Sequence, residues 1–127
     1  MTIEKPLKNL SDLNYVIVPS KVTIDDSFLE AYNKIFNFWA NSWDRTFKAS
    51  GSPQGHWLDH FVRQDVIVAL FNGNEPIGCH LYTLYNLKAQ STLKSEYFEY
   101  ISEESLRKLR TEKMNLTMSM EYLCVSP

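Results

Sequence analysis

The chain has 127 residues, 44% of them hydrophobic, and a formal net charge of −2, which together predict one domain, residues 1–127, with a buried core. Its 13 Lys and Arg residues are scattered along the chain, which argues against a nucleic-acid partner. No segment approaches the ~20 consecutive apolar residues of a membrane helix, so we also expect no membrane partner.

The amino-terminal half predicts a short strand followed by a long helix. The strand covers residues 15–18 and ends at Pro19. The helix should begin at a capping box formed by Ser27 and Glu30 and end before Gly51. Large apolar side chains recur along it every three or four residues and therefore share one face, which core packing explains better than a groove for a flat ligand. They are Phe28, Leu29, Tyr32, Ile35, Phe36, Trp39, Trp43 and Phe47.

A β-hairpin is the next strong signal, after a short helical turn at residues 56–61. Its strands are predicted at residues 65–71 and 76–85. Asn72-Gly73 between them is a favoured type I′ pair, because both residues tolerate positive φ.

The remainder of the chain predicts helices and then a last strand. Gly78, inside the second hairpin strand, indicates a bulge or a close approach by another group. Residues 86–113 interrupt the β pattern and predict one or two helices, the second capped by Ser102. The final strand, residues 115–125, should alternate its side chains without interruption, with Leu116, Met118, Met120, Tyr122 and Cys124 on one side. We therefore predict an α+β fold, a mainly antiparallel sheet packed against a long aromatic-rich helix.

The two cysteines, Cys79 and Cys124, both lie within apolar strand-like segments. This placement is typical of buried free thiols in a cytoplasmic protein, and residues 1–13 lack the apolar core of a secretory signal. A disulfide between the two would require neighbouring strands in the right register, which the sequence does not define.

The end of the chain carries a family resemblance. Leu123, Val125 and Pro127 resemble the apolar fourth strand that closes on Val-x-Pro in the GNAT superfamily of acyl-CoA-dependent N-acyltransferases. The hairpin VIVALFNGNEPIGCHLY and the order of the elements before it are similar to the amino-terminal half of that domain. Residues 86–113 depart from the family, whose third and fourth strands are usually joined by a short turn.

In the family, the fourth strand leads directly into an Arg/Gln-x-x-Gly-x-Gly/Ala loop that grips the coenzyme A pyrophosphate. The sequence stops at Pro127, so the resemblance implies a GNAT-like domain truncated after that strand. On this interpretation no residue of the chain is assigned to the pyrophosphate. We expect the chain alone to bind coenzyme A poorly and to turn over little.

The activity implied is transfer of an acyl group from acetyl-CoA or a longer acyl-CoA to a small-molecule amine. In the family, fourth-strand backbone pairs with the pantetheine arm, a role that would fall to Leu123, Cys124 and Val125. Glu121 stands where many members carry a glutamate that accepts a proton from the attacking ammonium. The alternative for Glu121 is an acid on the solvated face of an edge strand.

The acceptor amine would bind near the returning hairpin strand, if this strand follows the family arrangement. Tyr82, Tyr85 and Asn86 are the residues that would then line the acceptor pocket. Ordinary packing is the alternative for each of them.

A metal site is the weaker interpretation of two histidines. His56 and His60 are four residues apart and would share one face of a helix. Their spacing matches a zincin pair, but Trp57 stands where the catalytic glutamate would be. We therefore expect no metal.

A second functional hypothesis comes from a different class: a non-catalytic α+β binding or dimerisation module. A last strand without a partner presents free N–H and C=O groups, a template for another chain. This hypothesis predicts a homodimer formed through residues 115–125.

Overall fold

The computed structural model describes residues 12–20, 26–51 and 58–127. Its described residues fall into two compact units, the first formed by Met1–Tyr82 with Met120–Pro127 and the second by Thr83–Ser119. The strands are β1 (Leu13–Pro19), β2 (Val66–Asn72), β3 (Glu75–Asn86) and β4 (Leu116–Val125). The helices are η2 (Asp26–Phe28), α1 (Leu29–Ser50), α2 (Asp59–Arg63), α3 (Gln90–Leu93), η4 (Glu96–Tyr100) and α4 (Glu103–Thr111).

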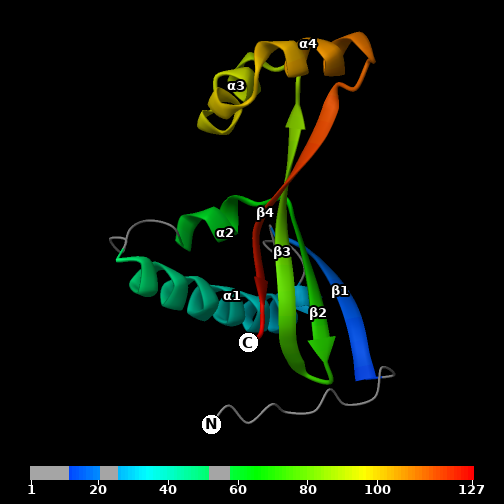
Figure 1. The fold of residues 1–127 in the computed structure, drawn as a ribbon. Coiled ribbons are helices and arrows are strands. Elements are labelled where there is room, and N and C mark those ends of the chain that lie inside the picture. The colour runs from blue at the N-terminus through cyan, green and yellow to red at the C-terminus, as the bar shows by residue number, and fades with distance from the viewer. Residues whose placement is uncertain (1–11, 21–25, 52–57) are drawn as a thin grey trace. The chain divides into compact units, whose positions relative to one another are not determined.

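The four strands form one antiparallel sheet in the order β1-β2-β3-β4, and α1 is the long helix (Figure 1). The predicted α+β class, with a mainly antiparallel sheet and a long helix, is confirmed at this level. β1 pairs with β2 from Leu13 opposite Asn72 to Pro19 opposite Val66. Antiparallel strands that follow each other in the chain can be joined by a short turn. β2 and β3 are joined in this way.

The hairpin between β2 and β3 differs from the predicted turn by one residue. Asn72 pairs with Glu75, so the two loop residues are Gly73 and Asn74. Gly73 has a φ of 62°, and Asn74 is not among the described residues with positive φ. A positive φ at the first loop position alone is the type II′ pattern, so the predicted type I′ pair was wrong.

The bulge predicted near Gly78 is present. The register of β2 and β3 shifts between Leu70 and Phe71: Leu70 pairs with Gly78 and Phe71 with Pro76. Ile77 is thereby left over in β3, which is the extra residue of a β-bulge.

The long helix α1 covers the core side of the first unit. Ile35 and Trp39 are fully buried, as is Val18 of β1. Phe61 of α2 lies against them, with ring centroids 5.1 Å from Trp39 and 5.2 Å from Tyr32. Most of the stripe is thus core, as predicted, whereas Leu29 is exposed. The members that belong to the core or pack against it are Phe28, Tyr32, Ile35, Phe36, Trp39 and Trp43. Truncating a buried aromatic side chain of this kind typically costs about 3–5 kcal/mol.

The two ends of α1 match the predictions unequally. Gly51 terminates it with a φ of 69° and donates its N–H to Lys48 O at 3.2 Å. At the amino-terminal end Phe28 is the N-cap, so the predicted N-cap, Ser27, was wrong by one residue, and the Glu30 side chain pairs with Lys34 at 3.1 Å. Ser27 lies in the turn η2 directly before α1.

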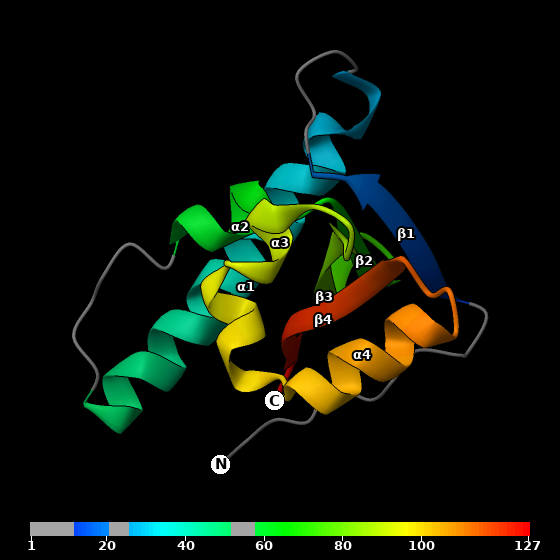
Figure 2. The same ribbon diagram turned by 90° about the horizontal axis from the view of Figure 1, so that it is seen from above.

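The second unit contains three short helices, drawn yellow to orange in Figure 2. Ser102 caps α4 as predicted, its hydroxyl accepting a hydrogen bond from Ser105 N at 3.2 Å. Phe98 is the buried aromatic here and meets Tyr85 at a centroid distance of 5.0 Å. A backbone hydrogen bond from Leu87 N to Asn115 O, 2.7 Å long, joins the segment before the three helices to the segment after them.

Within the described ranges, no helix has the length and apolar content needed to cross a bilayer.

Candidate functional site

The strand β4 is distorted at Tyr122, a non-glycine residue with a φ of 53°. The side chains of Met120 and Leu123 are exposed, whereas Glu121 and Tyr122 between them are both partly buried. The prediction that the side chains of this strand alternate without interruption was therefore wrong. A residue with positive φ acts like a bulge and turns two consecutive side chains toward one side of the strand.

Aromatic packing holds Tyr122 in this conformation. Its ring meets Trp39 at 5.7 Å and Trp43 at 5.4 Å, both nearly perpendicular, and lies 5.3 Å from the ring of His60. Each aromatic pair contributes about 0.5–1.5 kcal/mol beyond the area it buries. These contacts offset the ~1–3 kcal/mol that such a backbone conformation costs.

Glu121 is oriented by a buried glutamine. Its carboxylate Oε2 accepts a hydrogen bond from Gln64 Nε2 at 2.9 Å, and Gln64 is only 3% exposed. Gln64 is the C-cap of α2 and donates its own N–H to Phe61 O at 3.4 Å. The carboxylate is thus held from the helix-covered side of the sheet. The alternative prediction, a fully solvated acid on an edge strand, does not describe it.

The charge of Glu121 has an effect on its neighbour. Burial, and then the negative charge of Glu121, raise the pKa of the Tyr122 phenol above its ordinary value. Both causes favour the neutral phenol in the folded protein.

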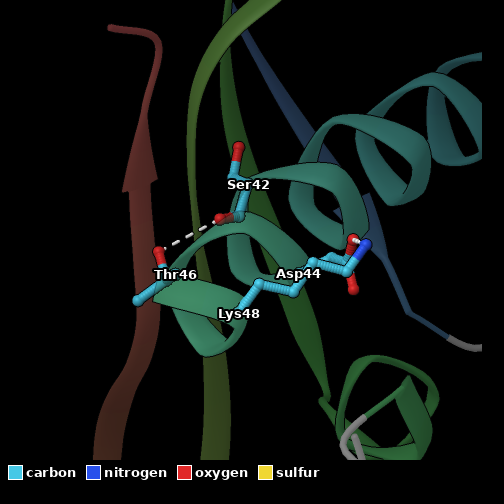
Figure 3. A network of polar contacts seen from close by, with 4 residues as sticks. All are labelled: Ser42, Asp44, Thr46 and Lys48. Atoms are coloured by element: carbon cyan, nitrogen blue, oxygen red, sulfur yellow. Dashed lines mark hydrogen bonds and ion pairs between the residues drawn. The ribbon is translucent and has the colours of Figure 1, made fainter. Parts of the chain in front are cut away.

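A cavity of about 450 Å³ lies between the end of β4 and the second half of α1. Its lining residues are Ser42, Trp43, Arg45, Thr46, Ala49, Leu123, Cys124, Val125 and Pro127, and none of these described residues is acidic. Arg45 therefore gives this wall a positive charge. Figure 3 shows Ser42 and Thr46 on the side of α1 next to the red ribbon of β4, with the Asp44–Lys48 ion pair turned away.

The helical wall of the cavity is fixed by local bonds. Thr46 Oγ1 donates to Ser42 O at 3.1 Å, and Ser42 Oγ donates to Phe38 O at 2.8 Å. Both hydroxyls keep lone pairs as acceptors, because each uses its proton within the helix.

The other wall is the outer edge of β4, which is the last strand in the sheet order. Ser126 N donates to Ile77 O at 2.8 Å, which fixes the side that faces β3. Because the N–H and C=O groups of successive residues alternate in direction, those of Leu123 and Val125 point toward the outer edge. The three predicted cofactor-binding residues, Leu123, Cys124 and Val125, are therefore brought into one cavity with α1.

The predicted acceptor residues are not grouped in the same way. Tyr82 alternates with the fully buried Leu81, so it lies on the face of the sheet opposite the core and opposite Glu121. Its hydroxyl lies 2.9 Å from His80 Nδ1 and 3.8 Å from Met120 Sδ.

Tyr85 and Asn86 belong to the second unit and make local contacts there. Tyr85 stacks on Tyr97 at 5.3 Å, and Asn86 Oδ1 accepts the backbone N–H of Lys88 at 3.0 Å. The acceptor role of Tyr82, Tyr85 and Asn86 stays a prediction.

Gln64 and the α1 residues of the cavity were not predicted from the sequence. Gln64 stands between Arg63 and Asp65 in a short polar run before an apolar strand, 57 positions from Glu121 in the chain, so no periodic pattern marks it. Arg45 and Thr46 lie beside the apolar stripe of α1, on positions that sequence alone assigns to solvent. Only the placement of β4 makes them lining residues of a cavity.

Of the two histidines considered for a metal, His56 lies outside the described residues, and His60 packs on Tyr122. Among the residues that the structure describes, no group of three or more His, Cys, Asp and Glu side chains is placed to hold a metal ion. A second cavity, of about 680 Å³, lies within the second unit between Leu93 and the α4 residues Glu103, Glu104, Leu106, Arg107 and Arg110.

Comparison with protein-family models, with curated proteins and with solved structures gave no match to this chain.

Proposed function

We propose that the first unit serves acyl transfer from a coenzyme A thioester to an amine, as the GNAT-like order of its elements implies. In this proposal Glu121 is the general base, and the outer edge of β4 at Leu123 and Val125 binds the pantetheine arm. The cavity beside β4 receives the thioester. The GNAT relationship itself is part of the proposal.

The observation that carries the proposal is the distortion of β4 at Tyr122. It places a hydrogen-bonded carboxylate, Glu121, one residue before it, and an open backbone edge beside a cavity directly after it. Bulges in edge strands re-aim side chains and are common next to active sites. Acyl transfer to an amine requires a general base for the ammonium proton and hydrogen-bond donors for the carbonyl oxygen, and both kinds of group occur in this part of β4.

These groups would act in two steps. The Glu121 carboxylate accepts a proton from the ammonium, directly or through a water molecule, which frees the nitrogen lone pair to attack the thioester carbon. As the carbon–nitrogen bond forms, negative charge develops on the carbonyl oxygen. A backbone N–H at Leu123 or Val125 stabilises that charge, the carbon–sulfur bond breaks, and the leaving thiolate takes the extra proton from the nitrogen, which gives a neutral amide and a free thiol.

The cavity suits the pantetheine arm by its shape and its polarity. Pantetheine is an extended chain with two amides, and amides pair with a strand edge as another strand does. The exposed apolar side chains of Leu123 and Val125 flank this edge. Arg45 supplies a positive charge at the opposite wall, which favours an anionic donor molecule over a cationic one.

The test uses S-acetyl-pantetheine beside acetyl-CoA, since the residues assigned here contact only the pantetheine arm. With the isotope-labelled full chain, both donors should perturb the backbone amide signals of Leu123 and Val125 at millimolar concentration. Amide signals of β1, at the other edge of the sheet, serve as the internal control. Unchanged Leu123 and Val125 signals with both donors would overturn the proposal.

A further inference from the structure

The two cysteines meet in the core of the first unit. Cys79 of β3 and Cys124 of β4 have their sulfur atoms 3.2 Å apart, and their exposed fractions are 1% and 9%. Both are free thiols. The structure thus supplies the strand register that the sequence left open.

The backbone around the two thiols has the geometry that a disulfide needs. Ser126 N donates to Ile77 O, and counting two residues inward from this pair along both strands places Cys79 opposite Cys124. Residues directly opposite in an antiparallel pair have Cα atoms about 4.5–5.5 Å apart, within the range of about 4.4–6.8 Å that disulfides span. A sulfur–sulfur bond of about 2.05 Å therefore requires the sulfurs to approach by only about 1 Å, which side-chain rotation provides.

The two thiols are not equivalent. Hydrogen bonding with Cys124, followed by burial, raises the pKa of Cys79, whereas the hydrogen bond with Cys79 is the main cause that lowers the pKa of Cys124. Cys124 also lines the cavity beside α1. The sulfur with the larger thiolate fraction is therefore also the one that a small molecule in the cavity reaches.

We propose that Cys79 and Cys124 are a redox modification site that forms a reversible intramolecular disulfide, with a hydroperoxide as the oxidant and Cys124 as the sulfur that reacts first. In the first step the Cys124 thiolate attacks one peroxide oxygen, the O–O bond breaks, and the released hydroxide takes a proton to become water. Cys124 is then a sulfenic acid.

In the second step the Cys79 sulfur attacks the Cys124 sulfur and gives up its proton. The sulfur–oxygen bond breaks, and the leaving hydroxide takes that proton to become the second water. Two thiols and one hydrogen peroxide thus give one disulfide and two waters. A dithiol reductant reverses the reaction by thiol–disulfide exchange.

The bond would cross-link β3 to β4 two residues after the distortion at Tyr122, in the wall of the cavity. This inference does not depend on acyl transfer, because it needs only the two sulfurs and access through the cavity.

The experiment treats the folded full chain with hydrogen peroxide, alkylates the remaining thiols under denaturing conditions and digests with trypsin without reduction. Trypsin separates the cysteines into residues 64–88 and residues 114–127. We expect one disulfide-linked species that joins these two peptides within a single chain and disappears on treatment with dithiothreitol. Two alkylated cysteines after peroxide, or a disulfide between two chains, would overturn the proposal.

The variants Cys79→Ser and Cys124→Ser separate the roles of the sulfurs, after circular dichroism has shown that each is folded. Cys79→Ser should accumulate a Cys124 sulfenic acid that dimedone traps, because the second sulfur is missing. Cys124→Ser should leave Cys79 unmodified for much longer, since Cys79 is fully enclosed. Faster trapping at Cys79 than at Cys124 would contradict the assigned order, and the wild-type peptide map decides the disulfide itself if either variant fails to fold.

Discussion

The position of Glu121, the proposed general base, depends on a partner distant in the sequence. Gln64 fixes one carboxylate oxygen and leaves the other lone pairs available. Hydrogen bonds to charged groups contribute about 1.5–3 kcal/mol, enough to select one orientation of a side chain on an edge strand. The pairing is consistent with a positioned base and with a purely structural carboxylate, and substitution distinguishes the two.

Glu121→Gln is the substitution of choice, because the amide oxygen still accepts the hydrogen bond from Gln64 while the proton-accepting carboxylate is lost. We expect the rate of acyl transfer to amines to fall by ~10²–10⁴-fold, with pantetheine binding unchanged. The rate is measured by mass spectrometry of the acylated amine. Glu75→Gln, which alters an exposed carboxylate at the start of β3, is the matched control. Equal rates in Glu121→Gln and wild type would remove Glu121 from the mechanism.

Tyr122 makes stability sensitive to alkaline pH. Its pKa is raised by burial and by the Glu121 charge, and burial also raises the pKa of Tyr32, both from an ordinary value of 10.0. In the unfolded chain these phenols ionise near that value, while the folded state keeps them neutral. The stabilisation is therefore complete below about pH 10 and is lost as the pH rises through the folded-state pKa values.

We expect the free energy of unfolding in urea to decrease above pH 10 and the Tyr122→Phe variant to lose less over the same interval. Tyr15→Phe is the control, because that side chain is 70% exposed. An identical alkaline decrease in wild type and Tyr122→Phe would show that Tyr122 does not contribute.

At the scale of elements, the features that neighbouring residues encode were predictable from the sequence, and the feature that tertiary contacts impose was not. The helix α1, the β2–β3 hairpin and the Ser102 cap were all predictable, because each is encoded by residues close together in the chain. The distortion at Tyr122 was not, since residues 122–125 are a continuous apolar run like that of a regular strand and no glycine marks the position. Tertiary contacts from α1 and α2 impose it.

The hairpin turn offers a test of backbone conformation within one element. Gly73 has a φ of 62°, and an added Cβ there meets no atom within 4 Å, so the cost of Gly73→Ala is conformational and not steric. We expect a loss of about 1–2 kcal/mol in the free energy of unfolding.

Gly78→Ala is the matched control, because its Cβ would lie 3.5 Å from Cys124 O, an ordinary contact, and its φ is not positive. It should change stability by less than about 0.5 kcal/mol. Urea unfolding measures both variants, and equal effects would mean that the positive φ carries no cost.

For the molecule as a whole, the contacts divide the chain into two compact units, with the boundaries within β3 and β4, and the single domain of residues 1–127 stays a prediction. The strands themselves look continuous in the sequence, so nothing local signals this division. The candidate site, too, was predictable only where its residues lie close together in the sequence. Leu123, Cys124 and Val125 share a strand and were found together, but Arg45 and Gln64 reach the site only through the tertiary fold.

The alternative function, a dimerisation module that pairs through β4, is favoured by the exposure of Leu123 and Val125 on an edge strand. It predicts a dimer in sedimentation velocity that Leu123→Lys dissociates. Ile17→Lys is the control, since Ile17 is 65% exposed on β1 at the opposite edge. A monomer at every concentration, or equal effects of the two substitutions, would exclude pairing through β4.

Because Tyr122 packs against two indole rings, tryptophan fluorescence can report on the distorted part of β4. Trp39 and Trp43 lie 5.7 Å and 5.4 Å from its ring, and Trp43 also lines the cavity beside β4. The third tryptophan, Trp57, lies outside the described residues, and replacing it with Phe would leave only these two tryptophans. The intrinsic fluorescence of that variant would then follow donor binding at the cavity and disulfide formation at Cys124 in real time, without any attached dye.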